Sequence, residues 1–127
     1  KTNKLLWISM YLISLLIIAG CGSSTGQATR IIKKPNVYTT GVDWDFSLGL
    51  SKGYYGKFRG VALNNGNAMA NDVTVTCRAT RDGRTIGSER QFLGNIPAGS
   101  SESFVMEVDF SGGNEARGTC EADCANC

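Results

Sequence analysis

The sequence predicts an all-β fold, an antiparallel β-sandwich that follows an N-terminal hydrophobic signal helix and a flexible tether. Apolar residues after position 36 alternate with polar ones, which is the period of a half-buried strand. Turn residues interrupt this alternation at regular intervals, and no segment after Cys21 has the apolar spacing of a helix. About six short strands separated by turns favour a single sandwich domain over residues 37–127.

Residues 1–20 have the charge pattern of a secretory signal peptide. Lys1 and Lys4 precede an uncharged, mostly apolar run over residues 5–20. The run ends in Ile18-Ala19-Gly20-Cys21, where small side chains precede a cysteine. This arrangement resembles the lipobox of bacterial lipoproteins. The resemblance implies cleavage before Cys21 and attachment of a diacylglycerol and palmitate to that cysteine.

Two other interpretations of the apolar run stay open. An uncleaved transmembrane anchor needs about 20 apolar residues, and this run is shorter. A pilin-like leader would carry a polar cleavage site before the run, which is not found there. If the host has two membranes, Gly22 favours the outer membrane, because it is not the aspartate that resembles an inner-membrane retention signal. In a host with one membrane, we expect the protein on the outer face of the cell membrane.

Residues 21–36 are predicted to be the lipidated cysteine and its tether. They are small and polar up to Thr29 and end in a short basic stretch at 30–35, which can contact anionic headgroups. Residues 30–59 hold six Lys or Arg against two Asp, whereas residues 60–127 hold five Arg against nine Asp or Glu. The protein after cleavage is therefore near neutral, and it has no basic field suited to nucleic acid.

The first two strands are predicted over residues 42–48 and 55–63. Val42, Trp44, Phe46 and Leu48 alternate with polar residues, so one face of the first strand is expected to be solvated. The second strand has apolar residues at both parities, so both of its faces are expected to be covered. Residues 64–67, Asn-Asn-Gly-Asn, end it with residue types that tolerate left-handed backbone angles.

Four further strands are predicted. In the third, Val73, Val75, Cys77 and Ala79 point inward between outward-facing Thr74, Thr76, Arg78 and Thr80. The Asp82-Gly83 pair predicts a tight hairpin into a return strand over 86–92. A turn at 96–99 leads to the alternation of Phe104, Met106, Val108 and Phe110, and a last strand is expected over 116–122.

The order of these features resembles the FxLYD-type immunoglobulin-like domains of prokaryotic lipoproteins. The residues that carry the resemblance lie over about 55–110 and are Gly60, Asn64-Asn65-Gly66, Asn71-Asp72-Val73, Arg81-Asp82-Gly83, Ile86-Gly87, Ile96-Pro97-Ala98-Gly99 and Phe104. Where the family has an aromatic residue followed by Leu-Tyr-Asp, this chain has Cys-Arg-Ala-Thr-Arg at 77–81. The resemblance implies an immunoglobulin-like fold and an adhesion or interaction module without catalytic residues.

Cys77, Cys120, Cys124 and Cys127 remain after Cys21, and an even number of cysteines in an exported chain favours two disulfides. Because Cys77 is on the inward parity of its strand, we expect it to face Cys120 across the core, which leaves Cys124 to pair with Cys127. Two alternatives use the same thiols. Three or four thiolates can bind zinc or an iron–sulfur cluster, and a C-x-x-C pair can act in redox chemistry, although this pair is expected at a frayed chain end.

Few residues suggest catalysis. The chain has no histidine, which is the commonest general base. Asp43 and Asp45 share one face of a strand and can act as paired carboxylates or calcium ligands, but they also fit the polar half of an amphipathic strand. Tyr54 and Tyr55 are candidate ligand contacts that can stack on a sugar, although aromatic residues at the start of a strand are more often core. Residues 100–103, Ser-Ser-Glu-Ser, are predicted to form a polar turn.

We therefore expect a membrane-anchored extracytoplasmic lipoprotein with a non-catalytic binding or scaffolding module. No cofactor and no nucleic-acid partner are expected. The expected partners are the membrane, through the lipid anchor, and a protein or polysaccharide of the cell envelope. The alternatives are a subunit of a surface filament or envelope complex, and a metal or redox protein that uses the C-terminal cysteines.

Overall fold

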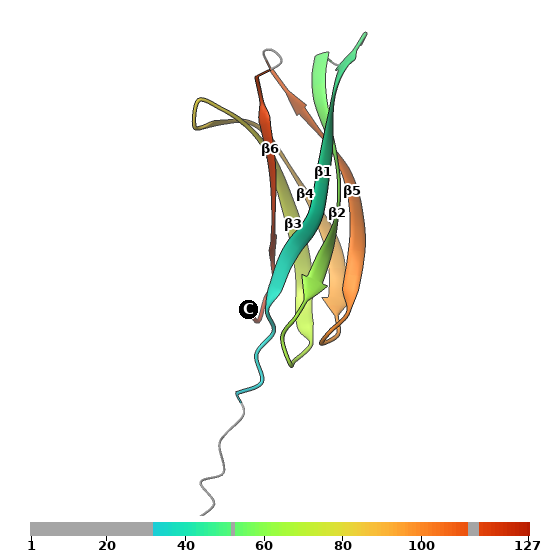
Figure 1. Cartoon of the computed structure of the whole chain (residues 1–127), viewed down its shortest axis with the longest axis vertical. Helices are drawn as coiled ribbons and strands as arrows, with labels where there is room; N and C mark the ends of the chain where they lie inside the picture. The colour runs from blue at the N-terminus through green and yellow to red at the C-terminus, as the bar shows by residue number, and fades with distance from the viewer. Residues whose placement is uncertain (1–31, 52, 112–114) are drawn as a thin grey trace, which may run out of the picture. The chain divides into compact units, whose positions relative to one another are not determined.

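The computed structural model describes residues 32–51, 53–111 and 115–127, and these residues form an all-β domain (Figure 1). The predicted signal helix at 1–20 and the lipidation site Cys21 lie outside the described residues. The strands are β1 (Val37–Gly49), β2 (Gly53–Asn64), β3 (Ala70–Arg81), β4 (Arg84–Ile96), β5 (Ser101–Phe110) and β6 (Arg117–Asp123). Over the same residues, no helix is long and apolar enough to cross a membrane.

The six strands form two antiparallel sheets of three strands each, which pack against one another. Sheet A has the order β1-β2-β5, and sheet B has the order β4-β3-β6. Apolar side chains from the inner faces of both sheets form one core, which confirms the predicted sandwich of two sheets. The buried core residues are Phe58, Ala62, Ala70, Val73, Val75, Cys77, Ala79, Ile96, Phe104, Met106, Val108 and Phe110.

The central strand of sheet B, β3, has the predicted alternation. Val73, Val75, Cys77 and Ala79 have no exposed surface, and the polar residues between them face outward. The predicted Asp-Gly hairpin is also confirmed. Its two residues both have positive φ, 51° at Asp82 and 75° at Gly83, as a two-residue type I′ turn requires.

The central strand of sheet A, β2, differs from the prediction in one respect. Phe58 and Ala62 on its inner face are fully buried, whereas Val61 and Leu63 on its outer face are only half-buried. Sheet B covers the inner face alone, so the prediction that both faces are covered is wrong. The half-exposed outer face therefore remains available as surface.

The first strand is longer than predicted and contains a β-bulge. β1 begins at Val37, and its pairing with β2 shifts between Thr40 and Asp43, where Gly41 has a φ of 59°. The one extra residue changes the parity of the strand, so that Thr39 before the bulge and Trp44 after it both face sheet B. The Trp44 ring stacks on Phe58 of β2 with centroids 5.5 Å apart.

The two sheets pack closely together where a glycine of β6 meets the aromatic residues of sheet A. A Cβ atom built on Gly118 would lie 2.5 Å from a ring atom of Phe58 and 2.7 Å from a ring atom of Trp44. These separations are too short for any side chain, so the glycine is needed for the packing of β6 onto β1 and β2.

Candidate functional site

The structure contains both predicted disulfides, and it places the first of them differently from the prediction. Cys77 of β3 lies directly opposite Cys120 of β6, with the two Cα atoms 4.0 Å apart. The bridge therefore joins neighbouring strands of sheet B and does not cross the core between the sheets. The predicted pairing is confirmed, and the predicted cross-core geometry is wrong because β6 extends sheet B beside β3.

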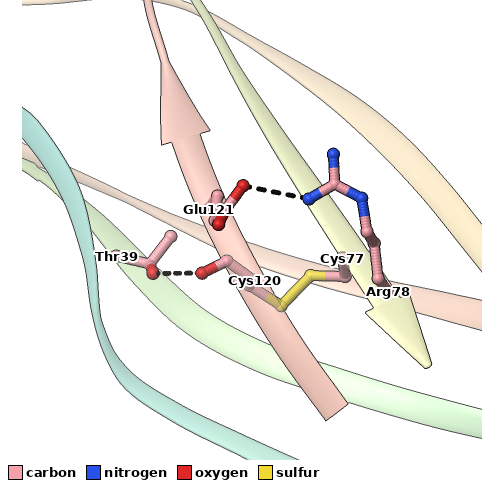
Figure 2. A network of polar contacts seen from close by, with 5 residues as sticks. All are labelled: Thr39, Cys77, Arg78, Cys120 and Glu121. Carbon is pink, nitrogen blue, oxygen red and sulfur yellow. Dashed lines mark hydrogen bonds and ion pairs between the residues drawn. A yellow bond between two sulfur atoms is a disulfide. The ribbon is translucent and has the colours of Figure 1, made fainter. Parts of the chain in front are cut away.

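Polar contacts surround this bridge on both faces of β6 (Figure 2). The hydroxyl of Thr39 in β1 donates a hydrogen bond of 2.8 Å to the carbonyl oxygen of Cys120, which links the edges of the two sheets. On the outer face, the Arg78 guanidinium contacts the Glu121 carboxylate at 2.9 Å. Covalent and polar links thus hold β6 against both β3 and β1.

The second disulfide, Cys124–Cys127, closes a tight C-terminal turn. The prediction that this end is frayed is wrong, because hydrogen bonds attach the turn to the start of β3. The Ala125 amide donates to the carbonyl oxygen of Asn71 at 2.9 Å. The Asn126 side chain donates to the carbonyl oxygen of Met69 at 2.9 Å, and its own oxygen accepts from the Asn71 amide at 2.8 Å.

The disulfides also bear on metal chemistry. Thiolates, and not disulfide sulfurs, are the ligands of zinc and of iron–sulfur clusters. Among the described residues, no group of three or more Cys, Asp or Glu side chains is placed to hold a metal ion. All four cysteines are paired in disulfides. The Cys77–Cys120 bridge holds β6 to β3, and the Cys124–Cys127 bridge closes the turn that follows β6.

The structure separates the two tyrosines proposed as ligand contacts. Tyr54 is on the inner parity of β2 and packs among aromatic rings, with its centroid 5.3 Å from that of Phe46 and 6.4 Å from that of Phe110. Tyr55 is on the outer parity, where its ring lies beside Gly49 of β1. The pair therefore does not form one contact surface, and Tyr54 belongs to the aromatic cluster at the edge of the core.

Asp43 and Asp45 lie exposed on the outer face of sheet A. The register places Asp43 opposite Arg59 and Asp45 opposite Lys57 on β2. Opposite charges on directly opposed residues of an antiparallel pair stabilise the pairing by a few tenths to about 1 kcal/mol. This geometry fits the interpretation that the two aspartates form the polar half of β1.

Asn64 has a role that the sequence did not reveal. It is a fully buried polar residue, and its side chain makes four hydrogen bonds. Its oxygen accepts from the amides of Asn36 at 3.2 Å and Gly66 at 3.0 Å. Its nitrogen donates to the carbonyl oxygens of Ala68 at 2.8 Å and Ile96 at 2.9 Å. One side chain thus joins the segment before β1, the β2–β3 loop and the end of β4.

Residues 64–67 end β2 as predicted, but without the left-handed backbone angles that these residue types tolerate. Asn64, Asn65 and Asn67 all have negative φ. Instead, the loop pairs with the chain just before β1. The Asn65 amide donates to Asn36 at 2.9 Å, the Asn67 amide donates to Lys34 at 3.2 Å, and the Lys34 amide donates to the Asn67 side chain at 2.8 Å.

The residues predicted to form a polar turn at 100–103 lie mostly in β5, which begins at Ser101. Only Ser100 lies in the turn, where its amide donates to the carbonyl oxygen of Pro97 at 3.0 Å. Its own carbonyl oxygen accepts from the Asn64 amide at 3.0 Å. These residues therefore support the same end of the sandwich that Asn64 holds together.

The outer face of sheet B carries an open polar groove with a volume of about 570 Å³. Its floor is β3, and its sides are β4 and β6. The lining includes Thr74, Thr76, Arg78, Arg90, Glu121 and Asp123. Sequence analysis identified the outward threonines but not the groove, because the groove depends on the register of three strands that are distant in sequence.

Comparison of the chain with protein-family models and with curated proteins gives no match.

Proposed function

We propose that this chain is a lipid-anchored extracytoplasmic protein whose β-sandwich is a non-catalytic binding or scaffolding module. The cysteines carry the proposal. Four of the five pair with one another in the folded domain, so that Cys21 is the one left for another use. Disulfides of this kind form and persist in oxidising compartments outside the cytoplasm, which agrees with the signal-like residues that precede Cys21.

We infer that the sandwich is of the immunoglobulin-like class, similar to the FxLYD-type domains. The strand order supports this inference. In an immunoglobulin sandwich strands A, B and E share one sheet and strands C and F share the other, to which variable-type domains add a C′ strand beside C. Sheet A, with β1-β2-β5, has the order A-B-E, and sheet B, with β4-β3-β6, has the order C′-C-F. The chain therefore has its fourth strand at the C′ position and not at the D position of the seven-strand constant-type domain. The three connections β2–β3, β4–β5 and β5–β6 each cross from one sheet to the other.

Two observations favour a binding role over catalysis. The chain has no histidine, and the Asp43 and Asp45 carboxylates lie opposite basic residues on an exposed sheet face. The groove on the outer face of sheet B is open to solvent and polar, which suits contact with an extended partner. A site that performs chemistry commonly encloses its substrate more completely.

Replacement of Cys21 tests the anchor. The Cys21→Ala chain should accumulate as an unprocessed precursor and incorporate no labelled palmitate, because the thiol that takes the lipid is gone. Ser23→Ala is the matched control and should be processed and labelled as the unaltered chain is. Normal processing and labelling of Cys21→Ala would overturn the proposal. Membrane fractionation of the same cells locates the anchored protein, which we expect in the outer membrane if the host has one, and otherwise on the outer face of the cell membrane.

A further inference from the structure

The groove on the outer face of sheet B has rows of complementary polar groups. In one row, Thr76 of β3 lies between Arg90 of β4 and Glu121 of β6. Directly opposed residues of antiparallel strands have Cβ atoms about 5 Å apart, so the row places a guanidinium, a hydroxyl and a carboxylate within about 10 Å. Among the described residues, the Thr76 hydroxyl makes no hydrogen bond that would occupy it.

The neighbouring row places an aromatic ring beside the groove, next to Thr74 but outside the residues that line the groove. Thr74 lies between Phe92 of β4 and Asp123 of β6. The Phe92 side chain is 64% exposed, although it is large and apolar and stands on an otherwise polar sheet face. Phe92 is not part of the core cluster, so its ring is free to contact a partner that also reaches the groove.

The charges of the groove nearly balance. Arg78 is paired with Glu121 at 2.9 Å, and the two side chains are 39% and 76% exposed. Arg90, Asp72 and Asp123 line the same groove, so the second basic residue is balanced by two carboxylates. Binding of a polyanion depends on unbalanced basic residues, and the groove has none. The apolar residues that line the groove, Ala122, Cys124 and Ala125, are all small, and an apolar peptide or lipid would need a larger apolar surface.

One backbone feature belongs to the same lining. Asp72 has a φ of 51°, which is uncommon for a residue other than glycine and is tolerated best by Asp and Asn. The pairing of β3 with β4 is irregular on both sides of Val73. This irregularity brings the Asp72 side chain into the groove beside Thr74. Residues held in such conformations are found preferentially at ligand sites.

We propose that this groove binds an uncharged polysaccharide, a proposal that rests on the binding role assigned to the domain. A sugar ring has an apolar C–H face that can cover the Phe92 ring. Its hydroxyl groups can donate to the carboxylates of Asp123 and Glu121 and accept from Arg90 and from the Thr76 hydroxyl. Because the two rows are two residues apart along β3, about 7 Å, an oligosaccharide reaches both rows.

The test uses the full isotope-labelled chain in a detergent without a sugar headgroup. The probes are cellohexaose and chitohexaose, two uncharged oligosaccharides, and the readout is the chemical shift of each backbone amide. We expect saturable shifts confined to the outward residues of β3, β4 and β6 that line the groove and to Phe92 beside it. Phe92→Ala should raise the dissociation constant at least tenfold, and Thr76→Val should raise it about threefold or more.

Val105→Ala is the matched control. Val105 is 54% exposed on the outer face of sheet A, so its truncation removes similar exposed apolar surface without touching the groove. It should leave the dissociation constant unchanged within twofold. Three results would overturn the proposal: no shifts with either oligosaccharide, shifts centred on another surface, or equal effects of the Phe92 and Val105 variants. Binding of polyphosphate at the groove in place of either sugar would also overturn it and assign the surface to a polyanion.

Failure of this proposal can be told apart from failure of the lipoprotein proposal. The groove requires only the folded sandwich, whereas lipidation requires only Cys21 and the residues before it. A chain that is lipidated but binds neither oligosaccharide retains its anchored role and loses the sugar ligand. A chain that binds the oligosaccharides but takes up no palmitate loses the anchor and keeps the ligand.

Discussion

Replacement of Asn64 by alanine tests how the N-terminal end of the sandwich is held together. The Asn64 side chain is fully buried and makes four hydrogen bonds. Each contributes about 1 kcal/mol net, and each buried partner left without a bond costs about 1–3 kcal/mol. The amides of Asn36 and Gly66 and the carbonyl of Ala68 are only partly buried, so water can replace some of these bonds, whereas the bond to Ile96 is buried. We therefore expect a loss of about 3 kcal/mol.

The free energy of unfolding is measured by urea denaturation followed by far-UV circular dichroism. In thermal unfolding, the same loss should lower the melting temperature by about 15 °C for a domain of this size. Asn65→Ala is the matched control, because Asn65 is the next residue in the same loop and its side chain is exposed. Its replacement should cost less than about 0.5 kcal/mol. If the two variants lose the same stability, the account of Asn64 as the link between these segments is refuted.

The other stability predictions concern the disulfides and the contact between the sheets. Loss of Cys77 should cost about 2–5 kcal/mol, because its bridge closes a loop of 43 residues, and urea denaturation measures this. The Cys124–Cys127 bridge closes a loop of only three residues, so the double replacement of these two cysteines should cost far less stability. Peptide mapping without reduction checks the pairing: a fragment that joins Cys77 to either C-terminal cysteine would contradict it. Gly118→Ala should cost about 1–3 kcal/mol, because the added methyl group overlaps the Phe58 ring, and an unchanged melting temperature would contradict the close packing.

Strands and turns were predictable because their signals are local. The alternation from Val73 to Ala79 is a property of consecutive residues, and the structure buries all four inward side chains. The Asp82-Gly83 turn was predictable for the same reason. The bulge in β1 was not, because Gly41 interrupts an alternation that is regular only after it. A single-residue change of parity leaves no other trace in the sequence.

The cysteine pairing shows where sequence reasoning ends. Strand parity predicted that Cys77 meets Cys120, and the structure confirms it. Parity does not tell whether two inward residues lie in the same sheet or in opposite sheets, because that depends on which connections cross between sheets. Asn64 was missed for a related reason. Its residue type predicts a turn, whereas its hydrogen bonds join Asn36 and Ile96, which are distant in sequence.

The groove likewise arises from long-range order. Thr76 was predicted to face outward. Its neighbours are Arg90 of β4 and Glu121 of β6, and β5 lies between these two strands in the sequence. Only the register of β3 with both partners places the three in one row. The candidate ligand contacts chosen from sequence, Tyr54 and Tyr55, are adjacent in the chain and for that reason point to opposite faces of β2.

The mass of the N-terminal peptide of the membrane-extracted protein tests the central claim most directly. The account predicts that this peptide begins at Cys21 and carries the added mass of a diacylglyceryl group, with or without a further acyl chain. A peptide that begins at Cys21 without any lipid, or an intact chain that still contains residues 5–20, would contradict it.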